Sequence, residues 1–165
     1  YSFYTMRVVI QRVKSASVTV DNAVVSSIGK GLCLLVGITQ EDTIADVSKL
    51  ANKILKLRLF EDIEQSAGTS TEWVGKPWMK SIIDIKGEIL SVSQFTLYAT
   101  IKKGTKPDFH KAQKGHLANE LYEAFLKELR DGLSVESVKD GVFGAMMDVG
   151  IVNDGPVTIV YDTKE

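Results

Sequence analysis

Polar side chains that can hold or activate a reacting group gather at one point of the chain. Ser93, Gln94 and Thr96 surround Phe95 at the end of an apolar run rich in Ile, Leu and Val. Strand ends often carry function, because the scaffold is rigid there and its side chains are reachable. An alternating strand with Phe95 inward and Thr96 outward explains the same residues without chemistry. Composition alone leaves both interpretations open.

A second segment of interest, Asn153-Asp154-Gly155-Pro156, separates two runs that are typical of strands and is followed by Val157 and Thr158. Proline fixes its own φ angle and restricts the residue before it, so Gly155-Pro156 is a stiff dipeptide. A rigid turn that presents carbonyl oxygens can recognise a ligand through its backbone alone. A plain structural turn fits the same residues.

A basic stretch extends from Lys102 to Gly115 and is broken by Gly104 and Pro107. Because the formal net charge is only −1, any contact with RNA must come from a local patch. Phe109 can stack on a base or anchor the loop. The stretch is therefore either a phosphate-contacting patch or a solvated loop. Its lysines are Lys102, Lys103, Lys106, Lys111 and Lys114.

Several common catalytic arrangements are missing from the sequence. His110 and His116 lie in or beside the basic stretch, a poor place for the fixed base of a triad. Cys33 lies in an apolar run, and one cysteine with two histidines does not make a zinc site. No acidic cluster, Walker loop, dinucleotide fingerprint or nucleophile elbow is present. We therefore expect neither a metal nor a cofactor.

The elements that position these groups follow from hydrophobic periodicity. Residues 61–80 are polar, with two glycines and a proline, and predict a surface loop in which Trp73 and Trp78 staple the chain down. A turn is expected at Asp21-Asn22. Strands are expected at Met6–Val13, Ser17–Val20, Val24–Ile28, Leu32–Ile38, Glu88–Phe95, Val142–Val149, Ile151–Val152 and Val157–Tyr161.

Two amphipathic helices complete the pattern. The first begins with a capping box at Thr43 to Asp46, and the second ends just before Gly132. This order predicts a single α+β domain with antiparallel or mixed, barrel-like sheets and two main helices packed outside. The inward residues are Ile44, Val47, Leu50, Ala51, Ile54 and Leu55 in the first helix and Leu117, Leu121, Phe125 and Leu129 in the second.

The expected cellular compartment is inferred from features that the sequence does not contain. One cysteine cannot form an internal disulfide, which favours a reducing compartment and a cytoplasmic protein. No apolar run approaches the roughly 20 residues that span a bilayer. Residues 1–5 lack the features of a signal peptide, and we interpret them as a tag remnant or extension ahead of a domain of residues 6–165.

Taken in order, the motifs of the chain resemble the D-aminoacyl-tRNA deacylase family, also called D-tyrosyl-tRNA deacylase. The Ser93 and Asn153 motifs are highly specific as a pair, although neither would suffice alone. The loop from Ile63 to Trp78 looks longer than in many members, and we attach no function to it. The matching segments are Met6–Val13, Leu57–Asp62, Ser93–Leu97, Lys106–Phe109, Phe143–Met147 and Asn153–Thr158.

The resemblance implies a cytosolic homodimer that removes D-amino acids from mischarged tRNA, a chiral proofreading step in translation. In the family the Gly155-Pro156 bond is cis and reaches into the partner's pocket, where its carbonyls exclude an L side chain. Arg12 resembles the arginine that holds this dipeptide, which Asn153 and Thr158 flank. The resemblance leaves open whether glycyl-tRNA is also cleaved.

The resemblance also assigns roles around the pocket. Phe143, Gly144 and Met147 lie where the family receives the terminal adenosine of the tRNA acceptor end. Backbone N–H groups near Gln94 and Phe95 are expected to stabilise the developing oxyanion, helped by a ribose hydroxyl of the tRNA. A nucleophilic Thr96 is the alternative mechanism, although no general base is evident beside it.

Other functions fit parts of the sequence. A nucleic-acid-binding protein without catalysis, for example in DNA replication, is opposed by the near-neutral charge and the lack of a DNA-reading motif. A sibling deacylase with a trans Gly-Pro bond would remove a misattached L-amino acid. An esterase for small substrates is disfavoured because the nucleophile elbow is missing.

Overall fold

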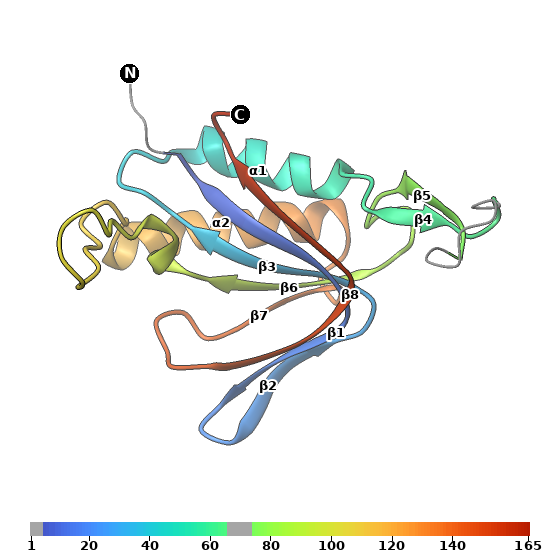
Figure 1. The fold of residues 1–165 in the computed structure, drawn as a ribbon, viewed down its shortest axis with the longest axis horizontal. Coiled ribbons are helices and arrows are strands. Elements are labelled where there is room, and N and C mark those ends of the chain that lie inside the picture. The colour runs from blue at the N-terminus through green and yellow to red at the C-terminus, as the bar shows by residue number, and fades with distance from the viewer. Residues whose placement is uncertain (1–4, 66–73) are drawn as a thin grey trace.

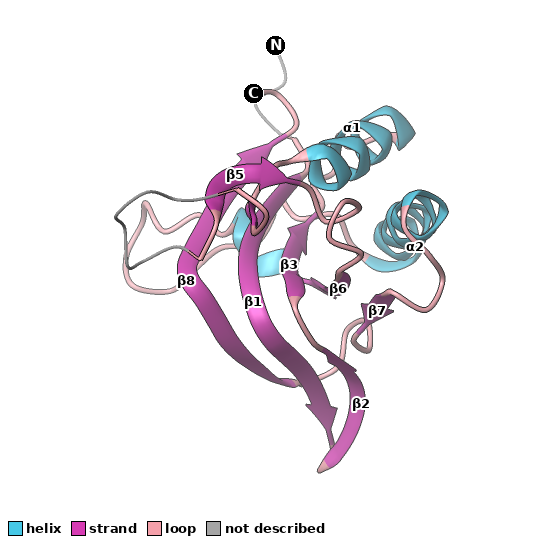
Figure 2. Ribbon diagram, turned by 90° about the vertical axis from the view of Figure 1, so that its right-hand side faces the viewer, coloured by secondary structure: helices cyan, strands magenta, loops and turns pink. Residues whose placement is uncertain are grey.

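The computed structural model describes residues 5–65 and 74–165. In this part of the chain, two α-helices cover one side of a strongly curved mixed sheet, and a small two-stranded sheet lies beside them (Figures 1 and 2). The predicted α+β, barrel-like architecture is thus confirmed. Of the expected extension 1–5, only Thr5 lies within the described residues, and it is buried.

The long strand β1 organises the main sheet, whose order is β2-β1-β3-β6-β7, with β8 also paired to β1. β1 is antiparallel to β2, β3 and β8, whereas β3, β6 and β7 run parallel. Asp21 and Asn22 have φ angles of 49° and 65°, as a two-residue hairpin turn requires. The strands are β1 (Arg7–Val20), β2 (Ala23–Ile28), β3 (Gly31–Gly37), β6 (Glu88–Ser93), β7 (Val138–Asp140) and β8 (Asp148–Asp162).

Strand β3 is buried on both faces, as its apolar run predicts. Leu32, Leu34 and Val36 face the helices and join the larger core cluster, whereas Cys33 faces the inside of the curved sheet and joins a second cluster. Burial raises the pKa of the Cys33 thiol to about 11, so this cysteine is an inert core residue. The two cores hold the sheet between them and make its strand ends rigid.

The two helices begin and pack much as predicted. α1 (Ile44–Lys56) starts with the expected capping box, in which Asp46 accepts a hydrogen bond of 3.0 Å from the Thr43 N–H. α2 (Gly115–Gly132) includes the glycine that the sequence pattern places just beyond its end. No described helix is long and apolar enough to cross a membrane.

The first residue of each predicted apolar face is an exception. Ile44 and Leu117 are 58% and 48% exposed, because each lies in the first turn, before its helix reaches the core. Their companions on the two faces are buried.

The predicted strand boundaries are wrong at three segments that carry candidate site residues, and the two strands predicted at Met6–Val13 and Ser17–Val20 are one continuous strand, β1. The strand β6 ends at Ser93 and continues into a 3-10 turn, η1 (Phe95–Tyr98). Residues 141–147 form a loop rather than a strand, because the short strand β7 ends at Asp140. Asn153 to Pro156 are not a turn between two strands. They form a bulge within the continuous strand β8, where the pairing register with β1 shifts.

The described ends of the polar segment 61–80 form strands rather than the predicted loop. Its ends belong to β4 (Phe60–Asp62) and β5 (Lys76–Lys80), which pair as the small antiparallel sheet. Trp78 lies on β5 and is 49% exposed. Trp73 lies outside the described residues.

Candidate active site

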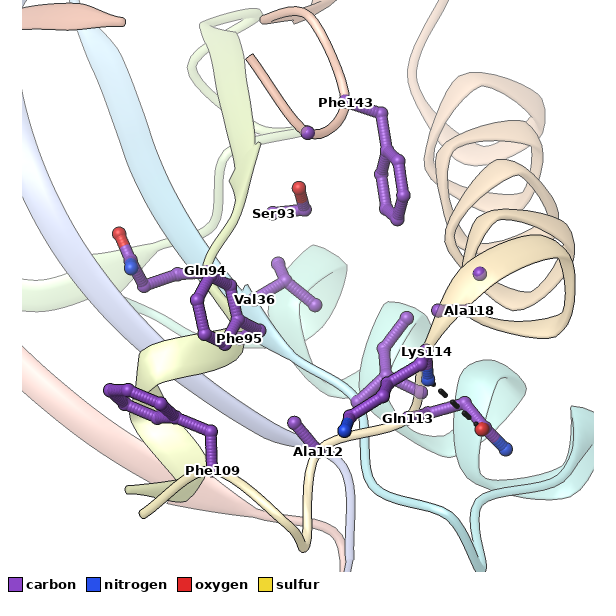
Figure 3. A pocket seen from close by; sticks show the side chains of 13 residues that line it. Val36, Ser93, Gln94, Phe95, Phe109, Ala112, Gln113, Lys114, Ala118 and Phe143 are labelled. Atoms are coloured by element: carbon purple, nitrogen blue, oxygen red, sulfur yellow. Dashed lines mark hydrogen bonds between the residues drawn. The ribbon is translucent and has the colours of Figure 1, made fainter. Parts of the chain in front are cut away.

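A pocket of about 440 Å³ opens where the end of β6 meets the first turn of α2 (Figure 3). Its walls are mainly apolar, which suits a flat or apolar ligand group. Figure 3 shows Phe143 beside α2, with Phe95 and Phe109 together on the other side. The lining residues are Val36, Ile38, Ser93, Gln94, Phe95, Phe109, Ala112, Gln113, Lys114, Gly115, Ala118, Phe143 and Gly144.

The Ser-Gln-Phe-Thr motif supplies one edge of this pocket. Ser93, Gln94 and Phe95 line it, whereas Thr96 is exposed and is not among the lining residues. The Gln94 N–H donates to the carbonyl oxygen of Val36 at 2.7 Å. That bond removes the Gln94 N–H from the donors that could face an oxyanion and leaves the Phe95 N–H as the candidate in this motif.

In the part of the chain that the structure describes, the Thr96 hydroxyl bonds an amide and no basic side chain. Its Oγ1 accepts a short hydrogen bond from the side-chain amide of Gln94, and an amide cannot take up a proton from a hydroxyl. The histidine nearest to Thr96 in the sequence, His110, is the next candidate base. It is exposed and contacts the carboxylate of Asp108. The His110 N–H donates to that carboxylate at 2.8 Å and holds the pKa of Asp108 below its usual range. This exposed pair does not line the pocket and orders the basic loop instead.

Two aromatic contacts shape the pocket. The rings of Phe95 and Phe109 meet edge to face, with centroids 5.1 Å apart. Phe143 packs on Tyr122, with centroids 5.9 Å apart. Phe109, which the sequence leaves as either a stacking residue or a loop anchor, reaches the pocket through its contact with Phe95.

Of the residues predicted in the 143–147 motif, two reach the pocket and one packs on the core. Phe143 and Gly144 line the pocket. Met147 points instead toward the inner core, and its sulfur lies 3.4 Å from the Val142 N–H. A Cβ built on Gly141 would lie 2.7 Å from that sulfur, so a larger residue there would require the flexible Met147 side chain to shift. Met147 therefore closes the loop rather than lining the pocket.

Gly155 and Pro156 lie in a different hollow of the same chain. Their peptide bond is cis, as the resemblance implies, and both residues are exposed on the bulge of β8. They border a cavity of about 810 Å³ that shares no residue with the apolar pocket. Within one chain, therefore, the two motifs are not brought together.

Arg12 holds the bulge of β8 in place through hydrogen bonds. Its side chain is buried, and Nε donates to the carbonyl oxygen of Asp154 at 3.1 Å while Nη1 donates to that of Leu59 at 2.8 Å. The Asp154 carboxylate lies 3.3 Å from the same Nε. The guanidinium thus ties the residue before Gly155 to the segment that follows α1.

Asn153 and Thr158 border the bulge on opposite sides. Thr158 pairs with Gln11 in β1, and the Asn153 amide lies 3.4 Å from the Gln11 side-chain oxygen. The one strand residue Gln11 therefore connects both ends of the motif. Neither Asn153 nor Thr158 lines the apolar pocket.

The three predicted lysines are exposed and lie beyond η1. Lys102 borders a third hollow, of about 530 Å³, together with Arg7, Tyr98 and Lys111. Lys103 and Lys106 border none of the three hollows. Among the described residues, no group of His, Cys, Asp or Glu side chains could hold a metal ion.

Several pocket residues are missing from the sequence prediction. Val36 belongs to β3 and Ile38 follows its end, and both look like ordinary core residues. Lys114 and Ala118 look like an ordinary helix start. Only the lysine offers a signal, because it belongs to the basic stretch. The parallel pairing of β3 with β6 and the packing of α2 bring these residues to the pocket.

Comparison with known proteins identifies the family. The model of the family described as D-Tyr-tRNA(Tyr) deacylase matches residues 9–162. The D-aminoacyl-tRNA deacylase of Schizosaccharomyces pombe is 55% identical over 160 residues, which cover 97% of this chain and 100% of the relative. The chain belongs to the D-aminoacyl-tRNA deacylase family. The expected class of enzyme, a hydrolase acting on carboxylic ester bonds, is confirmed with it.

Two solved structures support this family assignment at the level of the fold. The c-Myc DNA Unwinding Element Binding Protein superposes with a TM-score of 0.84 at 47% identity, covering 94% of this chain and 97% of that one. A probable eukaryotic D-amino acid tRNA deacylase superposes with a TM-score of 0.77, covering 96% and 100%. At 18% identity the second likeness concerns the fold alone.

Proposed function

We propose that this protein hydrolyses the ester bond of D-aminoacyl-tRNA and releases free D-amino acid and tRNA. The observation that carries the proposal is the apolar pocket of about 440 Å³, which places aromatic rings beside the backbone at the end of β6. Membership of the deacylase family supplies the substrate class. The 3′-terminal adenosine of the acceptor end enters this pocket, with its base beside Phe143 and Gly144.

The chemistry needs little from side chains, because an aminoacyl ester is already activated. The Phe95 N–H stabilises the developing oxyanion, and Ser93 borders the reacting group. A ribose hydroxyl of the tRNA positions or activates the attacking water. Thr96 is not the nucleophile in this mechanism, because its hydroxyl contacts the Gln94 amide rather than a base.

Selection of the D-amino acid comes from a second copy of the chain. Gly155-Pro156 is exposed and lies away from its own chain's pocket, so its carbonyls reach a substrate only in a partner's pocket. The strand β8 offers a surface for such a partner: it is an edge strand whose Val152 and Val160 are 54% and 61% exposed. A symmetric homodimer then completes two sites at once.

A gate of this kind rejects by collision with an L side chain, and glycine has no side chain. The same geometry therefore admits a glycyl ester. The lysines Lys102, Lys103 and Lys106 contact phosphates of the acceptor end, since they lie just beyond η1. Cys33 is free and buried, which fits a reducing cytoplasm.

The direct test is hydrolysis of matched D-tyrosyl-, L-tyrosyl- and glycyl-tRNA by the purified protein. We expect release of D-tyrosine and glycine, little release of L-tyrosine, and no effect of EDTA. Preferential release of L-tyrosine would favour the sibling activity instead. Sedimentation of the same sample should give the mass of a dimer, and an active monomer would overturn the shared gate.

A second function has one observation in its favour. The 47% identical solved structure is that of a protein named for binding a DNA unwinding element. A binding protein without catalysis would shift duplex DNA and leave D-tyrosyl-tRNA intact. The net charge of −1 opposes strong binding to duplex DNA, so we expect hydrolysis without such a shift.

A further inference from the structure

Two buried polar side chains and one partly buried carboxylate meet behind the aromatic wall of the pocket, and each comes from a different element. Tyr122 lies on α2, Ser91 on β6 and Asp140 at the end of β7. The Tyr122 hydroxyl oxygen lies 3.0 Å from Ser91 Oγ and 2.7 Å from Asp140 Oδ1. Tyr122 and Ser91 are fully buried, so these contacts form without competition from water.

The direction of the two hydrogen bonds follows from the chemistry. The Tyr122 hydroxyl has one proton, so it donates one hydrogen bond, to the Asp140 carboxylate. It accepts a hydrogen bond from the Ser91 hydroxyl. Burial raises the pKa of Tyr122, so the hydroxyl stays protonated and remains a donor. Burial also raises the pKa of Asp140, which the bond from Tyr122 opposes. The three groups satisfy one another inside the protein.

This network connects directly to the pocket. Asp140 immediately precedes the loop 141–147, which contributes Phe143 and Gly144 to the lining. The Gly141 N–H donates to the Ser91 carbonyl oxygen at 3.3 Å, and Ser91 lies two residues before Ser93 on β6. The network therefore fixes the pocket's aromatic wall relative to the strand end that carries the proposed chemistry.

The loop itself has few other constraints. Phe143 is 40% exposed and Met146 is 93% exposed. A Cβ built on Gly144, which has a φ angle of +77°, would meet nothing within 4 Å. The internal bonds join only Val142 to Ala145 and to Met147. The place of Phe143 thus depends on its ring contact with Tyr122 and on the anchor at Asp140.

We propose that Tyr122, Ser91 and Asp140 are positioning residues that hold Phe143 where it stacks on the base of the substrate's terminal nucleoside. The inference rests on the proposed function, because it assumes that this pocket receives the nucleoside. These residues touch no reacting atom, so their loss weakens binding of the substrate and leaves the chemical step nearly intact.

The test compares Tyr122→Phe with Tyr161→Phe. Each change removes one hydroxyl from a buried tyrosine, but the Tyr161 hydroxyl has no hydrogen-bond partner among the described residues. Two measurements are made on each full-length variant. Hydrogen exchange reports the mobility of residues 141–147, and steady-state kinetics with D-tyrosyl-tRNA gives KM and kcat.

We expect Tyr122→Phe to speed exchange in this loop and to raise KM roughly five- to tenfold, the effect of one lost buried hydrogen bond, with kcat changed less than about twofold. Tyr161→Phe should change neither. Exchange that stays slow in Tyr122→Phe would overturn the anchor. Faster exchange with an unchanged KM, or a loss confined to kcat, would overturn the role in substrate binding.

Two more variants keep the test decisive if Tyr122→Phe folds poorly. Ser91→Ala and Asp140→Ala each remove a different partner of the same hydroxyl. Combined with Tyr122→Phe, Asp140→Ala should raise KM by less than the product of the two single effects, whereas the effects of independent residues would multiply. A wild-type protein that releases no D-tyrosine would refute the proposed function and the binding role, while exchange in residues 141–147 that is faster in Tyr122→Phe than in the wild type would still verify the anchor.

Discussion

The guanidinium of Arg12 donates a hydrogen bond of 3.1 Å to the carbonyl oxygen of Asp154, the residue immediately before Gly155-Pro156. A second nitrogen of the same group bonds the Leu59 carbonyl oxygen at 2.8 Å. One planar side chain therefore connects the exposed bulge of β8 to the chain beyond α1. Lysine has one compact ammonium and cannot reproduce both directions.

We predict that Arg12→Lys lets the bulge move and lowers the preference for D- over L-tyrosyl-tRNA at least about tenfold, the equivalent of roughly 1.4 kcal/mol. Initial rates with the two esters measure this preference. Arg7→Lys is the matched control, since Arg7 lies on the same strand and pairs with Asp162 rather than with the bulge. Unchanged discrimination in a folded Arg12→Lys protein would contradict the gate.

A second prediction concerns the role of the Thr96 hydroxyl. Because this hydroxyl accepts a hydrogen bond from Gln94 and contacts no base, Thr96→Ala should lower kcat by no more than about tenfold. Removal of a true nucleophile costs about 10⁶-fold in a serine protease. Single-turnover rates with D-tyrosyl-tRNA decide between the two, with Thr96→Ser as the control that keeps a hydroxyl. A single-turnover rate that is lost in Thr96→Ala but kept in Thr96→Ser would support the covalent mechanism instead.

The lysines of the basic loop give a third prediction, on salt dependence. Each phosphate contact that is lost should flatten the slope of log affinity against log salt by roughly 0.7 to 0.9. The triple change of Lys102, Lys103 and Lys106 to alanine should therefore weaken tRNA binding and reduce this slope. Filter binding at several salt concentrations measures it. The same change at Lys56, Lys86 and Lys127 alters the net charge equally and should leave the slope close to the wild type.

The sequence predicts the parts of the fold whose local pattern and tertiary role agree. The apolar run of β3 and the capping box of α1 are examples. The loop 141–147 has the pattern of a strand because Val142, Phe143 and Met146 are apolar, but these residues are exposed around the pocket instead of packing in a sheet. At Asn153 to Pro156, local turn chemistry is overridden by pairing with β1, which carries the strand across the bulge.

The sequence predicts the motifs of the site more readily than it predicts which of their residues lie together. Ser93 and Phe143 lie far apart in the sequence and line one pocket only because β6 and β7 pair in parallel and α2 packs beside them. Tyr122, Ser91 and Asp140 look like a core tyrosine, a strand serine and a loop aspartate. Their hydrogen bonds depend on distances that no spacing in the sequence encodes.

Asp42 provides the last prediction, on the pH dependence of stability. This carboxyl group is buried, and one of its oxygens has no hydrogen-bond partner among the described residues. Burial raises its pKa to about 7 from an ordinary value of 3.8. The folded protein therefore binds a proton more tightly than the unfolded chain does. The resulting stabilisation is fully present below about pH 4 and is lost as the pH rises through about 7.

Asp42→Asn removes this titration and keeps an oxygen that can accept the 2.8 Å bond from the Thr39 N–H. Relative to wild type, the variant should become more stable as the pH rises from 4 to 7, by up to about 1.4 kcal/mol per pH unit. Urea unfolding of both proteins at pH 5 and pH 8 measures the difference, and the subtraction cancels the other titrating groups. An equal difference at the two pH values would show that Asp42 is ionised throughout, with the Thr39 N–H stabilising its charge.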